Sequence, residues 1–249
     1  MKILITRARA QSADFGNALQ QAGFEPVYFP VIEIRPAQDL STLQAALAEI
    51  GRYAWVIFTS VNAVDVVFDH IAKTGTAISL FDNLKIAAIG PKTAAALRLR
   101  GIEPFFIPDE FDGEALLSGL GDLQGKWLLL PRAEIARKFL PEAISAAGGR
   151  AHEISVYQTL PAQPDPQGLE ILKTGVEWIT FTSPSTVQNF IQIARQNGLD
   201  PFKLPGSPKI ACIGPVTFQA AEKEGFTDLQ MAKEYTVQGL IEVIARFAK

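Results

Sequence analysis

The chain has 249 residues, of which 48% are hydrophobic and 20% are charged, and its formal net charge is −3. This length and composition allow one large hydrophobic core or two ordinary ones. The mildly acidic balance excludes a basic field over the whole surface, so no nucleic-acid partner is expected. No apolar run reaches the roughly 18 residues of a membrane span, and the first residues lack a secretory signal pattern. We therefore expect a soluble, cytoplasmic protein in which the single cysteine, Cys212, is a buried and inert thiol.

Segments typical of strands and helices alternate along the chain. Helical spacing occurs, for example, at 12–23 and 91–101, and both segments end in glycine, as helices often do. The runs that predict strands are almost continuously apolar, which is expected for strands buried on both faces of a parallel sheet. They lie at 2–7, 26–34, 55–60, 85–90 and 104–108, and then at 126–132, 151–159, 178–183, 209–214 and 227–232.

The second half of the chain repeats the first. "WVIFTS" at 55–60 returns as "WITFTS" at 178–183, and "KIAAIGPKT" from Lys85 returns as "KIACIGPVT" from Lys209. The run from Lys2 resembles the run from Lys126, and "PDEFDGEALLSGL" at 108–120 matches "AKEYTVQGLIEVI" at 232–244. A period of about half the chain indicates two domains of one fold, not a solenoid. We therefore predict an α/β fold with two similar doubly wound, flavodoxin-like domains from an internal duplication, each with a parallel sheet of about five strands.

Polar residues follow two strands of each copy, where open α/β sheets bind their ligands. Asn62 and Ser185 follow the repeated Thr-Ser and are the predicted helix N-caps. One strand later, a Gly-Pro turn places Thr93 or Thr217 in the first turn of a helix. Such helix N-termini, with hydroxyls beside them, bind anions without Lys or Arg. The same residues also serve simply as caps, and the residues alone leave both interpretations open.

Other chemistries lack their motifs. The two histidines, His70 and His152, stand alone, and no metal-binding spacing, P-loop, dinucleotide fingerprint or nucleophile elbow occurs. Tyr157, in "EISVYQTLP", closes a strand-like run. It is either a core tyrosine with a satisfied hydroxyl or a functional one.

Motifs along the whole chain resemble the uroporphyrinogen-III synthase family. In order they are "ITRA", "PVIEI", "FTSVNAV", "IGPKTAAAL", "LLPRAEIAR", "VYQT", "FTSPSTV" and "IGPVT". Each motif is loose, but their order, spacing and total length are specific. The resemblance implies a lyase of haem biosynthesis that needs no cofactor. It closes hydroxymethylbilane, a linear tetrapyrrole with eight carboxylates, into uroporphyrinogen III, with inversion of ring D and loss of water.

The resemblance also implies site residues. Tyr157 is the implied catalytic residue, donating a hydrogen bond to the departing hydroxyl. Arg137 resembles a basic position at the rim of the family's cleft. No metal site is implied. The implied substrate-binding residues are Thr59, Ser60, Asn62, Thr93, Arg137, Ser183, Ser185, Thr186 and Thr217.

In the family the chain crosses twice between two lobes. The resemblance therefore implies one lobe from residues 1–35 and 164–249, another from 39–160, and two extended linkers near 36–38 and 161–163. It also implies a monomer, without nucleic-acid or membrane partners, that receives its substrate from the preceding enzyme of the pathway. The residues alone leave open a two-lobed, non-catalytic binding protein for small anions, and a different cofactor-free transferase or lyase on the same fold.

Overall fold

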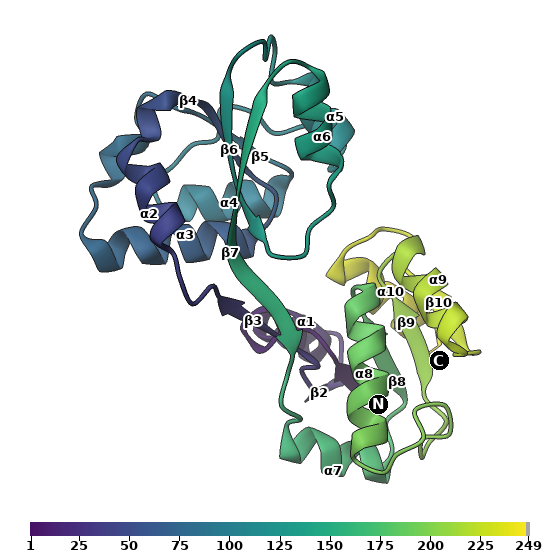
Figure 1. Cartoon of the computed structure of the whole chain (residues 1–249). Helices are drawn as coiled ribbons and strands as arrows, with labels where there is room; N and C mark the ends of the chain where they lie inside the picture. The colour runs from purple at the N-terminus through teal and green to yellow at the C-terminus, as the bar shows by residue number, and fades with distance from the viewer. Residues whose placement is uncertain (248–249) are drawn as a thin grey trace. The chain divides into compact units, whose positions relative to one another are not determined.

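The computed structural model describes residues 1–247 and divides the chain into two compact units (Figure 1). Unit 1 contains Met1–Glu33 and Leu160–Lys249, and unit 2 contains Ile34–Thr159. The residues predicted as linkers, 36–38 and 161–163, fall at the ends of two strands. These strands are β3 (Ile32–Pro36) and β7 (Arg150–Pro161).

Unit 1 is built on a sheet in which all the strands run parallel. Its spatial order is β10 (Leu229–Met231), β9 (Lys209–Cys212), β8 (Trp178–Phe181), β1 (Lys2–Ile5) and β2 (Glu25–Tyr28). Read from β2, this is the order 2-1-3-4-5 of flavodoxin-like sheets, which confirms the predicted fold class. The carboxyl ends of β1 and β8 therefore lie side by side at the centre of the sheet, where such folds bind ligands.

The sheet of unit 2 has the order β3, β7, β6 (Trp127–Ala133), β4 (Tyr53–Phe58) and β5 (Lys85–Ala88). The four strands from β7 to β5 are parallel. The prediction of a strand at 104–108 was wrong, because only an isolated bridge between Ala87 and Phe106 forms there. With this bridge, the order from β7 onward repeats the order of unit 1.

The run at 26–34, predicted as one strand, is two strands in different sheets. β2 ends at Tyr28 and β3 begins at Ile32. Pro30 lies in the break, and a proline has no N–H group with which to continue a ladder. β3 lies beside β7 at the edge of the sheet of unit 2, where Ala37 N donates to Val156 O at 2.9 Å.

Helices cover both faces of each sheet, so most strand residues are buried on either side. In unit 1 one face packs on α1 (Ala13–Gln21) and α10 (Val237–Arg246), and the other on α7 (Pro166–Thr174), α8 (Pro184–Gln196) and α9 (Pro215–Glu224). In unit 2 one face packs on α2 (Ser41–Ala48), α3 (Val61–Thr74) and α4 (Pro91–Leu99), and the other on α5 (Gly113–Ser118) and α6 (Phe139–Ala146). Short 3-10 turns occupy Arg9–Gln11, Ile50–Arg52 and Ile78–Phe81.

Cys212 closes β9 inside the core of unit 1. It is a free thiol with no exposed surface, and burial raises its pKa to about 12. Because the thiolate is the reactive form, this cysteine is inert, as predicted. Within residues 1–247, no helix has both the length and the apolar character that crossing a membrane requires.

Candidate active site

The repeated Thr-Ser supplies the N-caps of α3 and α8. Ser60 caps α3 and Ser183 caps α8, each through its side-chain oxygen. The prediction of Asn62 and Ser185 as N-caps was therefore wrong by two residues, since both lie inside the first helical turn. The reason is local, because the cap must precede the first helical residue with an extended backbone, and the serine of each Thr-Ser has that position and conformation.

Thr186 completes a reciprocal capping box at the start of α8. Its hydroxyl accepts from the backbone N–H groups of Thr182 and Ser183, both at 3.2 Å, and donates to the carbonyl of Ser183 at 2.7 Å. The side chain is fully buried. The hydroxyls of Ser183 and Ser185 lie beside this box, 2.9 Å apart and half-buried. Thr186 therefore holds the turn, while the two serines are the hydroxyls that a ligand can reach.

Ser183→Ala is expected to lower the free energy of unfolding by about 1 kcal/mol, because it removes a side-chain cap. The measurement is the midpoint of urea unfolding. Ser185→Ala is the matched control, since the side chain of Ser185 contacts the cap hydroxyl without capping the helix, and its expected effect is smaller. Equal midpoints for the two variants would contradict the role given to the cap.

The Gly-Pro turns at α4 and α9 differ from the Thr-Ser turns. Gly90 and Gly214 are the N-caps, and the prolines after them occupy the first helical position, as predicted. Neither glycine offers a side-chain acceptor, so no side chain caps the N–H groups of these turns. Thr93 and Thr217 are buried beneath the turns. These two helix starts therefore present backbone N–H groups, not hydroxyls, to an anion.

Tyr157 lies inside β7, not at its end as predicted, because the strand continues to Pro161. Arg132 pairs with Ser155 and Ala133 pairs with Tyr157, so the register between β6 and β7 shifts at this point. The shift leaves Val156 as an extra residue, and both Val156 and Tyr157 are buried. Such bulges redirect a side chain, so Tyr157 packs into the same core as its neighbour Val156.

The hydroxyl of Tyr157 lies 3.1 Å from Oγ of Ser60, and either atom can be the donor. Ser60 Oγ also accepts from the backbone N–H of Ala63. Tyr157 has only 7% of its surface exposed, so its ring is fixed and the hydroxyl alone is placed at this edge of the sheet. When Ser60 donates to the phenol oxygen, the phenol proton is available to a ligand.

Thr59 and Arg137 line a pocket of about 290 Å³ in unit 2. Its walls also include the rings of Phe111 and Phe139 and the side chain of Arg132. We call it the Phe111–Phe139 pocket. Thr59 and Arg137 were predicted from the sequence as site residues, whereas Phe111, Phe139 and Arg132 were not.

Arg132 holds the loop that carries Arg137. Its Nη1 donates to Oε2 of Glu153 at 3.0 Å, and its Nη2 donates to the backbone carbonyl of Arg137. Arg132 is 8% exposed, and its Nε is buried without a hydrogen-bond partner among the described residues. Lys138 also bonds Glu153, at 3.3 Å, so the carboxylate is shared by two cations.

The strand registers reveal an arginine equivalent to Arg132 in unit 1. The repeated tryptophans, Trp55 and Trp178, pair with Leu128 and Ile3 respectively. Leu128 and Ile3 are therefore equivalent, and the fourth residue after each is an arginine, Arg132 or Arg7. An alignment of the two copies at Lys2 and Lys126 places Arg7 opposite Pro131, one position before Arg132. Burial lowers the pKa of the Arg7 guanidinium, and the charge of Asp14 opposes the effect.

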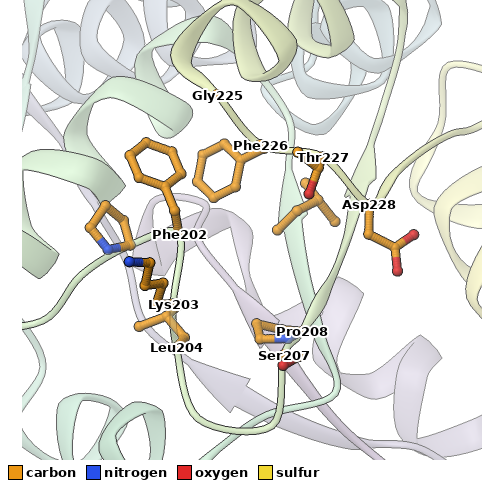
Figure 2. A pocket seen from close by; sticks show the side chains of 11 residues that line it. Phe202, Lys203, Leu204, Ser207, Pro208, Gly225, Phe226, Thr227 and Asp228 are labelled. Carbon is orange, nitrogen blue, oxygen red and sulfur yellow. The ribbon is translucent and has the colours of Figure 1, made fainter.

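A second pocket, of about 280 Å³, lies in unit 1 at the amino ends of β9 and β10 (Figure 2). Figure 2 shows Phe202 and Phe226 on one side of it, and their ring centroids are 5.0 Å apart. Asp228 on the other side bonds Lys209 at 2.8 Å. Open α/β sheets bind ligands at the carboxyl ends of their strands, so we do not assign the substrate to this pocket.

These features define the class of protein. It has two related, flavodoxin-like units, and the carboxyl edge of each sheet presents hydroxyls, helix starts and an arginine. Among residues 1–247 no group of three or more His, Cys, Asp or Glu residues could hold a metal ion. The carboxyl ends of the strands in each unit therefore offer donors that suit a carboxylate ligand.

The chain matches the family model "Uroporphyrinogen-III synthase HemD" over residues 13–242. It is 34% identical to the uroporphyrinogen-III synthase of Synechococcus elongatus, covering 99% of this chain and 95% of the relative. It is 30% identical to the uroporphyrinogen-III synthase of Chlorobaculum parvum, covering 90% and 89%. The chain belongs to the uroporphyrinogen-III synthase family, whose members are enzymes of porphyrin biosynthesis with a tetrapyrrole substrate.

Solved structures show the same fold. A mutant uroporphyrinogen III synthase from Thermus thermophilus aligns with a TM-score of 0.64 at 18% identity, covering 100% of both chains. The uroporphyrinogen-III synthetase of Helicobacter pylori aligns with a TM-score of 0.64 at 17% identity, covering 99% of this chain and 98% of the other. At these identities the likeness concerns the fold alone.

Proposed function

We propose that this chain is a uroporphyrinogen-III synthase that cyclises hydroxymethylbilane with inversion of ring D and loss of water. The observation that carries the proposal is the placement of Tyr157. Its hydroxyl is held at the carboxyl edge of the sheet by a bulge in the β6–β7 pairing and lies against Ser60. A fixed hydroxyl at a ligand-binding edge is what the first step of this reaction needs.

In that step the bond between the terminal carbon and its hydroxyl oxygen breaks. The lone pair of the terminal pyrrole nitrogen expels the oxygen, and Tyr157 donates a hydrogen bond to it as it departs. The oxygen takes up one proton and the pyrrole N–H releases one, so water leaves and an azafulvene remains. Ser60 fixes the direction of the phenol through the 3.1 Å contact. A hydroxyl that is already oriented loses little entropy when it meets the leaving group.

The carboxylates of the substrate bind to neutral donors and to Arg137. We assign direct contacts to the accessible residues Thr59, Ser60, Asn62, Arg137, Ser183 and Ser185, and to the N–H groups of the Gly-Pro turns. We assign to Thr93, Thr186 and Thr217 the task of holding the turns, because their side chains are buried. A charge near an exposed helix end gains about 0.3–1 kcal/mol, so several such contacts must act together.

Inversion follows from positioning. The bilane also closes without enzyme, but then gives the uninverted isomer, so the protein must exclude the carbon of ring D that reacts in solution. Holding the reacting groups in one geometry contributes as much as about 7–11 kcal/mol in favourable cases. This free energy is large enough to change the product isomer, because each tenfold change in the ratio of the two closure rates needs only about 1.4 kcal/mol.

The proposal includes a cytoplasmic monomer that receives hydroxymethylbilane from the preceding enzyme of the pathway. Its support is the family resemblance and the reactivity of the bilane. Because the bilane closes spontaneously to the wrong isomer, a short transit between the two enzymes lowers the amount that closes before it is bound.

A coupled assay tests the proposed reaction. Hydroxymethylbilane is generated in situ, this protein is added, and the oxidised porphyrin isomers are separated and quantified. We expect mostly type III product, against type I in the protein-free control. Only type I product would overturn the proposal and favour the two-lobed, non-catalytic anion-binding protein.

A further inference from the structure

The Phe111–Phe139 pocket has two aromatic walls that the hydrophobic core does not require. Phe111 is 62% exposed, and Phe139 is also exposed. Each ring lies against a glycine. A methyl group built on Gly90 would lie 3.2 Å from the ring of Phe111, and one on Gly113 would lie 2.9 Å from the ring of Phe139. The rings therefore lie against backbone, and both line the pocket together with Thr59.

The charges around the pocket favour one carboxylate at a defined place. Two arginines line the pocket. Arg132 donates to Glu153 and to the carbonyl of Arg137, so we expect the guanidinium of Arg137 to be the one that pairs with a ligand. Asp112 also lines the pocket, but its Oδ1 accepts from the N–H of Ala115 at 2.8 Å. Glu114 is exposed on the same wall and opposes an anion.

The size of the pocket fits one ring of a tetrapyrrole and not four. Pockets for drug-sized molecules span about 300–1,000 Å³, and this one, of about 290 Å³, lies just below that range. A flat pyrrole ring has two faces for the two phenyl rings. Eight carboxylates over four rings give each ring two acidic side chains, one of which can pair with Arg137.

Unit 1 places an aromatic ring at the matching position. Tyr235 is 63% exposed, and a methyl group built on Gly214 would lie 3.3 Å from its ring. Thr236 follows it and caps α10, as Asp112 follows Phe111 and caps α5. The exposed ring on the Gly-Pro turn is thus a shared feature of both units.

We propose that the Phe111–Phe139 pocket is the subsite for one pyrrole ring of the substrate, held between the two phenyl rings with one carboxylate on Arg137. This inference rests on the proposed function for the identity of the ligand. It makes Phe111 and Phe139 substrate-contacting residues of unit 2.

The test uses the full chain and a monopyrrole that carries two carboxylate side chains. Backbone amide signals are followed by NMR while the monopyrrole is added into the millimolar range. We expect saturable shifts at Gly113 and Phe139. Phe111→Ala is expected to weaken binding by about five- to tenfold, the size of a lost aromatic stacking contact. Glu114→Gln is expected to strengthen binding, because it removes the opposing charge.

Phe105→Ala is the matched control. Phe105 is 65% exposed in the same unit, but it packs on Trp55, with the ring centroids 5.5 Å apart, at the opposite edge of the sheet. Its loss is expected to leave monopyrrole binding unchanged. Equal weakening by Phe105→Ala and Phe111→Ala, shifts confined to the pocket of Figure 2, or no shifts at all would overturn the inference.

The isomer assay separates this inference from the proposed function. Type III product without monopyrrole binding at the pocket leaves the enzyme assignment intact and overturns the subsite. Monopyrrole binding with the expected variant pattern, but only type I product, supports the pocket and removes the proposed reaction.

Discussion

Tyr157→Phe is expected to lower kcat by about 100-fold and to raise the share of uninverted type I product. The substitution removes the hydroxyl that assists the departure of oxygen and leaves the ring in place. General acid assistance contributes about 10²–10⁴-fold, and the low end applies because water and neighbouring hydroxyls remain. Single-turnover kinetics on freshly generated hydroxymethylbilane, with separation of the isomers, measures both quantities. The share of type I product rises because spontaneous closure competes with a slower enzyme.

Tyr53→Phe is the control for this prediction. Tyr53 is also a buried tyrosine of unit 2, and its hydroxyl lies 2.6 Å from Nδ1 of His152. Tyr53 lies at the amino end of β4, whereas Tyr157 lies toward the carboxyl end of β7. Both variants lose one partly buried hydrogen bond and are expected to lose a similar stability, about 1 kcal/mol. An equal fall of kcat in the two variants would assign the effect of Tyr157 to stability and contradict its catalytic role.

The sequence predicted the fold because the same signal occurs twice. The runs "WVIF" and "WITF" are strands, which end before the predicted Thr-Ser, and the helices at 12–23 and 91–101 form close to their predicted limits. The prediction was wrong where pairing, not local pattern, decides the structure. Phe106 has the apolar neighbours of a strand residue, yet it makes only one bridge. The run at 26–34 divides at a proline between two sheets, which a count of apolar residues cannot show.

The candidate site was predicted only in part. Residues that follow a strand directly, such as Thr59 and Ser60, could be placed because their position depends on local order along the chain. The orientation of Tyr157 depends on a register shift against β6, which the sequence of β7 alone does not predict. Phe111 was visible in the repeat as the partner of Tyr235. Its exposure and its contact with Gly90 depend on how the loop before α5 folds back.

Arg132→Met is expected to lower the free energy of unfolding by about 1–2 kcal/mol and to raise KM several-fold. Methionine keeps much of the apolar volume but removes the hydrogen bonds to Glu153 and to the carbonyl of Arg137. Breaking a fully buried ion pair costs about 3–5 kcal/mol. The cost here is smaller, because the side chain of Glu153 is 30% exposed and keeps Lys138 as a partner. The loss of the unpartnered Nε also offsets part of it.

The KM effect follows from the contact with Arg137. Without Arg132, the backbone of Arg137 loses a donor, and its guanidinium is no longer fixed beside the pocket. Urea unfolding and steady-state kinetics measure the two effects. Arg52→Met is the control, because Arg52 bonds Glu49 at 2.6 Å on the surface, where such pairs contribute about 0–1 kcal/mol. An unchanged KM in Arg132→Met, with the expected loss of stability, would show that Arg132 supports the β6–β7 pair but does not position Arg137 for the substrate.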